Sequence, residues 1–242
     1  LHRLPIKRAI KKFALLRCFN RWALAGKTIL FPTFTFDFTR SGVYYKDLRN
    51  SEVGMLGEWV LDLDSAVRTD HPIYSVAAIG PRLGEVLSCD QGESFGSGGL
   101  FHHILTTGVS VVMLGAKWEN CTLFHCLEQE AAVPYRYLKK FTGKKIEMGI
   151  THDVETQMYV RDENMGVEND FTQLIGKITP SVFQAVALPE CRSIDGRELH
   201  AIGSDILAKD QFAFVKNSQS IMWACQMKTQ CATQPPVTIY LF

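Results

Sequence analysis

Apolar residues follow two different spacings along this chain. Short runs rich in apolar and β-branched residues predict strands, and stretches with apolar residues three or four positions apart predict helices. Strands are expected at residues 28–36, 74–79, 111–114, 144–150, 157–161, 182–188, 211–216 and 237–242. Helices are expected at residues 2–25, 51–66, 82–88, 169–178 and 195–207, and from about residues 100 and 120 onwards, with a loop at 37–50. This alternation is typical of an α/β domain, so we expect one domain over residues 1–242, with the natural N-terminus upstream of Leu1.

The composition is that of an ordinary globular protein, with 46% hydrophobic and 21% charged residues. A formal net charge of +1 provides no overall field for nucleic acid, and we expect no nucleic-acid partner. No apolar run is long enough to span a membrane, and the opening residues lack a signal-peptide core. The seven cysteines are scattered, without a C-x-x-C pair or zinc spacing, which indicates free thiols in a reducing cytoplasm and no metal site.

The stretch from residue 111 to 128 has the clearest chemical pattern. An apolar run that predicts a buried strand breaks at Gly115, and a helical spacing follows, for which Asn120 is a suitable N-cap. On that helix Cys121, His125 and Glu128 are expected to share one face, since they are four and three residues apart. Histidine beside glutamate is a plausible general base with a group that holds it, although such pairs also occur as plain surface contacts.

Two other stretches suggest contacts with anions. The loop at residues 94–99 is the most glycine-rich of the chain and precedes a predicted helix, so its amides could cradle a phosphate or carbonyl oxygen, or it could be a flexible connection. The basic helix at 2–25 is either a solvated face or a handle for a phosphate-bearing ligand. Ala-Gly-Lys-Thr at 25–28 lacks the upstream glycine of a P-loop and precedes a strand, which excludes that motif.

Three blocks of this sequence together resemble the antibiotic N-acetyltransferase family, the aminoglycoside 3-N-acetyltransferases and their relatives. They are Arg-Thr-Asp-His-Pro-Ile-Tyr-Ser-Val at 68–76, Phe-Gly at 95–96, and Leu-Gly at 114–115 followed by Thr-Leu-Phe-His-Cys-Leu-Glu at 122–128. Phe-Pro-Thr-Phe-Thr at 31–35 also fits the family. The chain departs from the family pattern at Cys121, where many members have Asn, and at residues 99–100, where many have Ser-Pro. The early family strand with His-Ser-Ser is not visible before Thr28.

The resemblance implies a mixed sheet flanked by helices and direct transfer of an acyl group from acetyl-CoA, or another short acyl-CoA, to an amine on a sugar-like ring. No metal is needed. In this reading His125 removes a proton from the attacking amine, Glu128 orients the imidazole, and loop amides hold the oxyanion. The resemblance further assigns coenzyme contacts to Arg68, Thr69, Pro72 and Ser75, although this block could also be a structural turn. It assigns substrate contacts to Asn120, Thr122 and Gly96.

Two other activities and two substrates stay open at this point. Cys121 could be a nucleophile activated by His125, or the chain could be a non-catalytic binding protein on the same fold. As substrate we favour a nucleotide-linked amino sugar of surface-polysaccharide synthesis, because the charge is balanced, the N-terminal helix is basic, and Phe38, Tyr44 and Tyr45 could stack on a base. The alternative is an aminoglycoside, a polycation. The oligomeric state is open.

Overall fold

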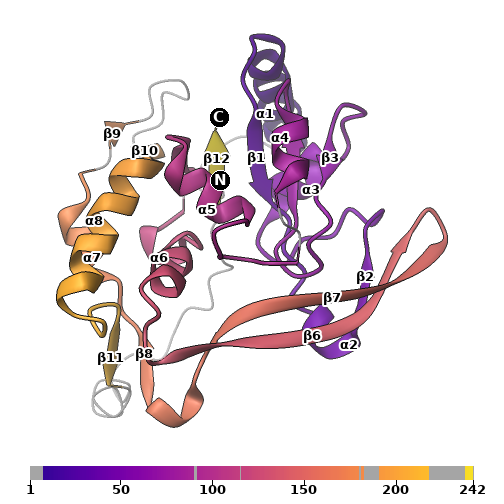
Figure 1. Cartoon of the computed structure of the whole chain (residues 1–242). Helices are drawn as coiled ribbons and strands as arrows, with labels where there is room; N and C mark the ends of the chain where they lie inside the picture. The colour runs from indigo at the N-terminus through magenta and orange to yellow at the C-terminus, as the bar shows by residue number, and fades with distance from the viewer. Residues whose placement is uncertain are drawn as a thin grey trace.

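A seven-stranded sheet forms the centre of the computed structural model, which describes residues 8–89, 92–114, 116–179, 181–182, 191–217 and 238–241 (Figure 1). In spatial order its strands are β3 (Val67–Arg68), β4 (Val76–Ile79), β1 (Ile29–Pro32), β12 (Thr238–Leu241), β5 (Ser110–Leu114), β10 (Cys191–Asp195) and β9 (Ser181–Val182). Every neighbouring pair in this sheet is antiparallel. Parallel pairing occurs in a smaller sheet, between β2 (Val43–Tyr45) and β6 (Arg136–Glu147). The predicted mixed α/β fold is confirmed.

Helices cover both faces of the large sheet, because successive residues of a strand point to opposite sides. On one face, Ile29, Phe31 and Leu114 pack with Phe19 of α1 (Arg8–Leu24) and Trp59 of α3 (Met55–Val60). The opposite face packs against α5 (Leu100–Thr106), α6 (Phe124–Glu130), α7 (Thr172–Lys177) and α8 (Gly196–Lys209) through a larger cluster. The basic N-terminal helix and the helix at 124–130 therefore lie on different faces of the sheet.

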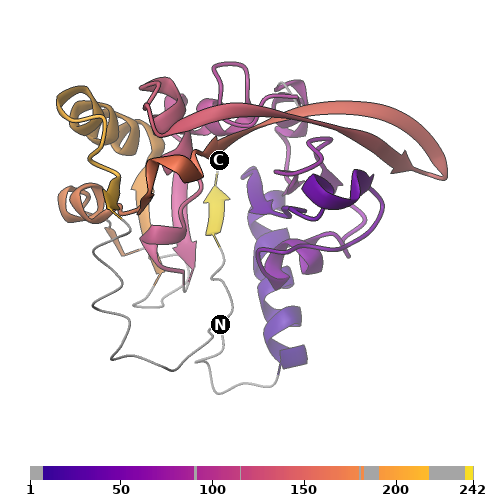
Figure 2. The same cartoon turned by 90° about the horizontal axis from the view of Figure 1, so that it is seen from below.

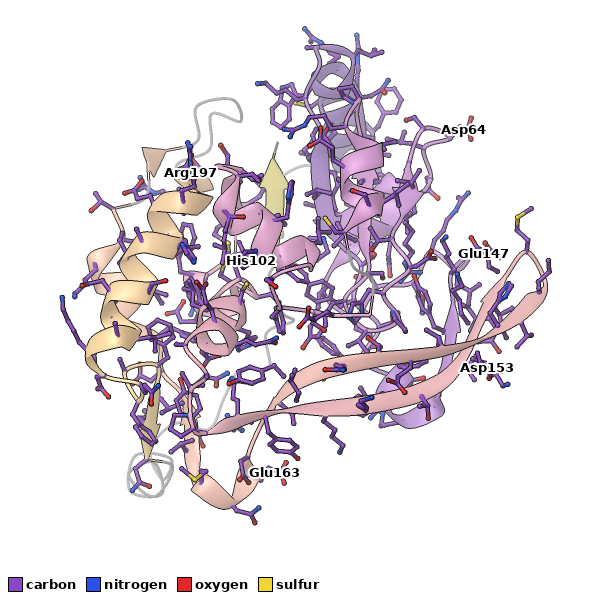
Figure 3. All side chains as sticks on the ribbon, viewed as in Figure 1. Asp64, His102, Glu147, Asp153, Glu163 and Arg197 are labelled. Atoms are coloured by element: carbon purple, nitrogen blue, oxygen red, sulfur yellow. The ribbon has the colours of Figure 1, made fainter. Side chains whose placement is uncertain are left out.

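A long hairpin of β6 and β7 (Ile150–Arg161) extends beyond the rest of the fold (Figures 1 and 2). Its pairing runs from Arg136 opposite Arg161 to Glu147 opposite Ile150. Met148 and Gly149 form its turn, both with positive φ, as a tight two-residue turn requires. Acidic residues such as Glu147 and Asp153 lie on its outer part (Figure 3). The predicted strands at 144–150 and 157–161 were too short. They missed residues 136–143 and 151–156, most of which are exposed and carry no regular apolar alternation.

Several other boundaries differ from the predictions. The helix expected at 51–66 is limited to α3, which follows Gly54 at a φ of 129°. The expected loop at 37–50 contains α2 (Phe38–Ser41) and β2. The prediction at 169–178 divides into β8 (Val167–Asn169) and α7, and the strand expected at 211–216 is β11 (Val215–Asn217). Strand β10 was not predicted. Most of the strand expected at 182–188, and Gly115, lie outside the described residues.

The remaining helical elements are short: α4 (Leu83–Ser88) and the 3-10 turns η1 (Trp118–Asn120) and η2 (Glu163–Met165). Strand β12 lies between β1 and β5 and pairs with both, so it joins the two halves of the large sheet. Within the described residues, no helix is long and apolar enough to cross a bilayer.

Candidate active site

The segment between β5 and α6 does not fold as the sequence suggested. Asn120 ends the turn η1, Cys121 follows in an extended conformation, and α6 begins at Phe124 without a side-chain cap. The predictions that Asn120 caps the helix and that Cys121 shares its face with His125 are therefore wrong. Residues 118–120 form the 3-10 turn, so the α-helix cannot begin at residue 120 as predicted and begins at Phe124 instead. His125 and Glu128 do lie on α6, three residues apart and on one face.

His125 and Glu128 form a direct contact. Nδ1 of His125 lies 2.6 Å from Oε2 of Glu128, and the histidine side chain is 22% exposed while the glutamate side chain is fully buried. The rings of Phe95 and Phe171 flank the imidazole, with centroids 5.8 Å and 5.9 Å away. The imidazole is thus held through Nδ1, and its side chain is partly exposed to solvent.

Two residues from beyond the helix complete the surroundings of Glu128. The hydroxyl of Tyr135 donates to Oε1 at 3.0 Å, and Nε of Arg136 lies 2.9 Å from Oε2 as an ion pair. The sequence did not identify either residue. They enter the site because the chain turns back at Ala132, whose φ is +48°, and leads into β6, a turn for which the sequence has no glycine signal.

The charge state of Glu128 follows from these contacts. Burial raises the pKa of this carboxyl, but the opposing charges of His125 and Arg136 and the two hydrogen bonds outweigh it, so its pKa lies below the ordinary value. An ionised carboxylate only accepts hydrogen bonds, so Nδ1 of His125 must donate. The lone pair of a neutral imidazole is then on Nε2, which makes no hydrogen bond within the described residues. This tautomer is the one that a general base facing solvent needs.

The glycine-rich loop lies against α6. Sγ of Cys126 donates to the carbonyl of Phe95 at 3.1 Å, which fixes the loop beside the helix. A Cβ on Gly96 would lie 1.8 Å from Oε1 of Glu93, so glycine leaves room for that carboxylate. Of the other residues assigned to substrate, Asn120 is exposed and Thr122 is half-buried, with its carbonyl accepting from the amide of His125 at 3.1 Å.

The block at 68–75 is turned into the protein. Arg68 is 5% exposed and donates to the carbonyls of Thr33 and Leu48 and to the hydroxyl of Ser75, at 2.7, 2.6 and 3.0 Å. Thr69 and Ser75 are fully buried or nearly so, and the carbonyl of Pro72 accepts from Thr35 at 2.7 Å. These side chains use their hydrogen-bonding groups inside the protein, so any effect they have on a coenzyme acts through the backbone that they hold.

His71, within the same block, connects three segments. Its Nδ1 accepts from the amides of Ile73 and Tyr74 at 3.1 and 3.0 Å. Its Nε2 lies 2.9 Å from Oγ of Ser94, at the start of the glycine-rich loop, and 3.2 Å from Oγ1 of Thr156 on β7. The turn after β3 thereby positions the loop beside α6.

The cysteine alternative has little support in this geometry. Cys121 is 2% exposed, and burial raises its pKa to about 12. Burial also raises the pKa of Cys126. Because the thiolate is the nucleophilic form, neither residue is in an environment that would activate it.

The family model and the curated relative that match this chain have the same description. Residues 13–208 match the family model described as aminoglycoside 3-N-acetyltransferase. A curated relative, aminoglycoside N(3)-acetyltransferase III of Serratia marcescens, is 29% identical over 100 residues, which are 41% of this chain. The match spans 35% of that relative, about a third of its length.

Solved structures with a similar fold include AAC-IIIb in binary complex with CoASH, with a TM-score of 0.60 at 18% identity over 75% of this chain and 77% of that one. The YokD protein of Bacillus subtilis has a TM-score of 0.57 at 16% identity, covering 76% and 79% of the two chains. Sisomicin-bound AAC-VIa also has a TM-score of 0.57, at 17% identity over 75% and 79%. Because these sequence identities are at most 18%, the structural similarity supports a shared fold and nothing beyond it.

Proposed function

This chain belongs to the aminoglycoside 3-N-acetyltransferase family, and we propose from that membership that it transfers an acyl group from acetyl-CoA, or another short acyl-CoA, to an amino group of an amino sugar. The observation that carries the proposal is the 2.6 Å contact between Nδ1 of His125 and buried Glu128. It leaves Nε2 of a partly exposed imidazole without a hydrogen bond among the described residues, so this nitrogen is available to accept a proton.

The proposed reaction has two steps. Nε2 of His125 accepts a proton from the substrate amine while the nitrogen of that amine attacks the thioester carbonyl, and a C–N bond forms. The tetrahedral oxyanion then collapses, the C–S bond breaks, and the coenzyme thiolate takes the proton from the His125 imidazolium, which gives the amide, free coenzyme A and neutral His125. Glu128 stabilises the imidazolium between these steps. The oxyanion donors that we assign are amides of residues 96–98, since the amide of Gly99 already donates to the carbonyl of Gly96 at 2.9 Å.

For the substrate we propose an aminoglycoside, which reverses the preference drawn from the sequence. The matching family model and the curated relative are both described as aminoglycoside acetyltransferases, and two of the arguments for a nucleotide-linked sugar do not hold in the structure. The basic helix α1 packs on the sheet face opposite α6. Phe38 and Tyr44 are buried, at 2% and 1% exposure, and are not available to stack on a base. Tyr45 is 47% exposed, but it lies on β2, where it pairs with Ile146 of the hairpin.

The test compares two substrates with acetyl-CoA as the donor. The full chain is incubated with sisomicin or with a uridine-diphosphate-linked amino sugar, and released coenzyme A and product mass are measured. We expect monoacetylated sisomicin. Turnover of the nucleotide-linked sugar without turnover of sisomicin would contradict the substrate assignment. Binding of acetyl-CoA without turnover of either would favour the non-catalytic alternative.

A further inference from the structure

Gln129 lies one helical turn after His125 on α6, so the two side chains share a face of the helix. Its Nε2 donates to Oε1 of Glu93 at 3.4 Å, a weak contact. Its Oε1 is buried and has no hydrogen-bond partner in the described part of the chain. A buried carbonyl oxygen without a donor is costly, which suggests that a donor from outside the protein completes it.

Glu93 is the second unusual group here. Its carboxylate is half-buried against Gly96, and no basic side chain among the described residues forms an ion pair with it. Other acidic residues around α6 have basic side chains as partners: Glu128 pairs with Arg136, and Oε2 of Glu130 lies 2.7 Å from Nε2 of His200. Glu93 therefore presents an unpaired negative charge close to the candidate active site.

We infer that Glu93 and Gln129 bind a second ammonium group of the substrate while the reacting amine lies at His125. This inference rests on the proposed function. A carboxylate beside an orphaned carbonyl oxygen offers only acceptors, and an ammonium group supplies both the positive charge and several N–H donors. Residues four apart on a helix have Cβ atoms about 5–6 Å apart, a separation that two amino groups on one or two linked sugar rings can span.

Gly96 leaves the space that the Glu93 carboxylate occupies in the proposed ammonium site. A side chain at Gly96 would occupy the position of the Glu93 carboxylate, 1.8 Å from Oε1. The Gly96→Ala variant should therefore displace the carboxylate without removing its charge. The backbone of Gly96 does not have a positive φ, so alanine causes no backbone strain there.

The experiment measures kcat and KM for sisomicin and for D-glucosamine, which carries a single amine. Glu93→Gln should raise the sisomicin KM about 10- to 100-fold, the usual effect of losing a close charge pair, with kcat within about threefold. Gln129→Met and Gly96→Ala should each raise KM about three- to tenfold. The D-glucosamine KM should not change in Glu93→Gln and Gln129→Met. The matched control is Glu130→Gln, which removes a carboxylate of the same helix that already has His200 as a partner, and it should leave the sisomicin KM unchanged.

Binding of sisomicin by calorimetry separates this inference from the proposed function. If the wild type does not acetylate any amine, the proposed function fails, but weaker sisomicin binding by Glu93→Gln than by Glu130→Gln would still support the ammonium site. Equal KM and equal affinity in the wild type, Glu93→Gln and Gln129→Met would overturn the inference. So would a rise in the D-glucosamine KM as large as that for sisomicin.

Discussion

The hydroxyl of Tyr135 is a small group whose removal should have a large and pH-dependent effect. Tyr135 is fully buried, and its hydroxyl donates to Oε1 of the Glu128 carboxylate at 3.0 Å. Phenylalanine fills the same space, so Tyr135→Phe creates almost no cavity and removes one hydrogen bond to a charged group. Such a bond contributes about 1.5–3 kcal/mol. We expect the free energy of unfolding at neutral pH to fall by about that amount.

Tyr159→Phe is the matched control. Tyr159 is also buried, at 6% exposure, but its hydroxyl donates to a neutral acceptor, the carbonyl of Val133, at 3.2 Å. Its loss should cost about 0.5–1.5 kcal/mol. Urea unfolding of the wild type and both variants, at neutral pH and at about pH 4, measures the two differences.

The pH dependence distinguishes the two tyrosines. The pKa of Glu128 lies below its ordinary value of 4.5 in the folded protein, so this ionisation contributes stability above the unfolded pKa, and that stability is lost as the pH falls through the folded pKa. Removing the Tyr135 hydroxyl brings the folded pKa closer to the ordinary value. The loss in the free energy of unfolding caused by Tyr135→Phe should therefore be largest at neutral pH and become smaller below about pH 4.5. The loss caused by Tyr159→Phe should be the same at both pH values. Equal losses in the free energy of unfolding for both variants at both pH values would refute this account of Glu128.

Two further predictions concern other parts of the chain. Cys121→Ser should keep most of its activity, since the buried thiol is not activated, and mass spectrometry of the protein with acetyl-CoA alone should detect no acyl adduct; an adduct on the intact chain would restore the nucleophile hypothesis. Gly80→Ala should lower the free energy of unfolding by about 1–3 kcal/mol, because Gly80 has a φ of +123° and a Cβ would lie 2.3 Å from the carbonyl of Lys27. Gly84→Ala, with open space around it in α4, should stabilise slightly or have no effect, and equal thermal melts for the two variants would show that the reasoning about Gly80 is wrong.

Local patterns in the sequence predicted the features that depend on local physics. The strands at 76–79 and 111–114 are continuous apolar runs because both of their faces are buried, and the spacing of His125 and Glu128 alone places both on one helix face. The contacts of Glu128 with Tyr135 and Arg136 depend on a turn at Ala132, where the sequence has no glycine. Pro134 marks a turn nearby but does not indicate which side chains that turn brings to Glu128. The position of β12 between β1 and β5 depends on long-range pairing, which periodicity does not encode.

The central claim is that His125 is the general base, and the most direct measurement is the kcat of His125→Ala with sisomicin and acetyl-CoA both saturating. We expect kcat to fall by about two to four orders of magnitude, the usual contribution of general-base catalysis, while acetyl-CoA binding and the unfolding midpoint stay close to those of the wild type. His102→Ala, on α5 (Figure 3), removes a histidine outside the proposed machinery and should keep wild-type kcat. A His125→Ala variant that retains near-wild-type kcat at saturating substrate would contradict the claim.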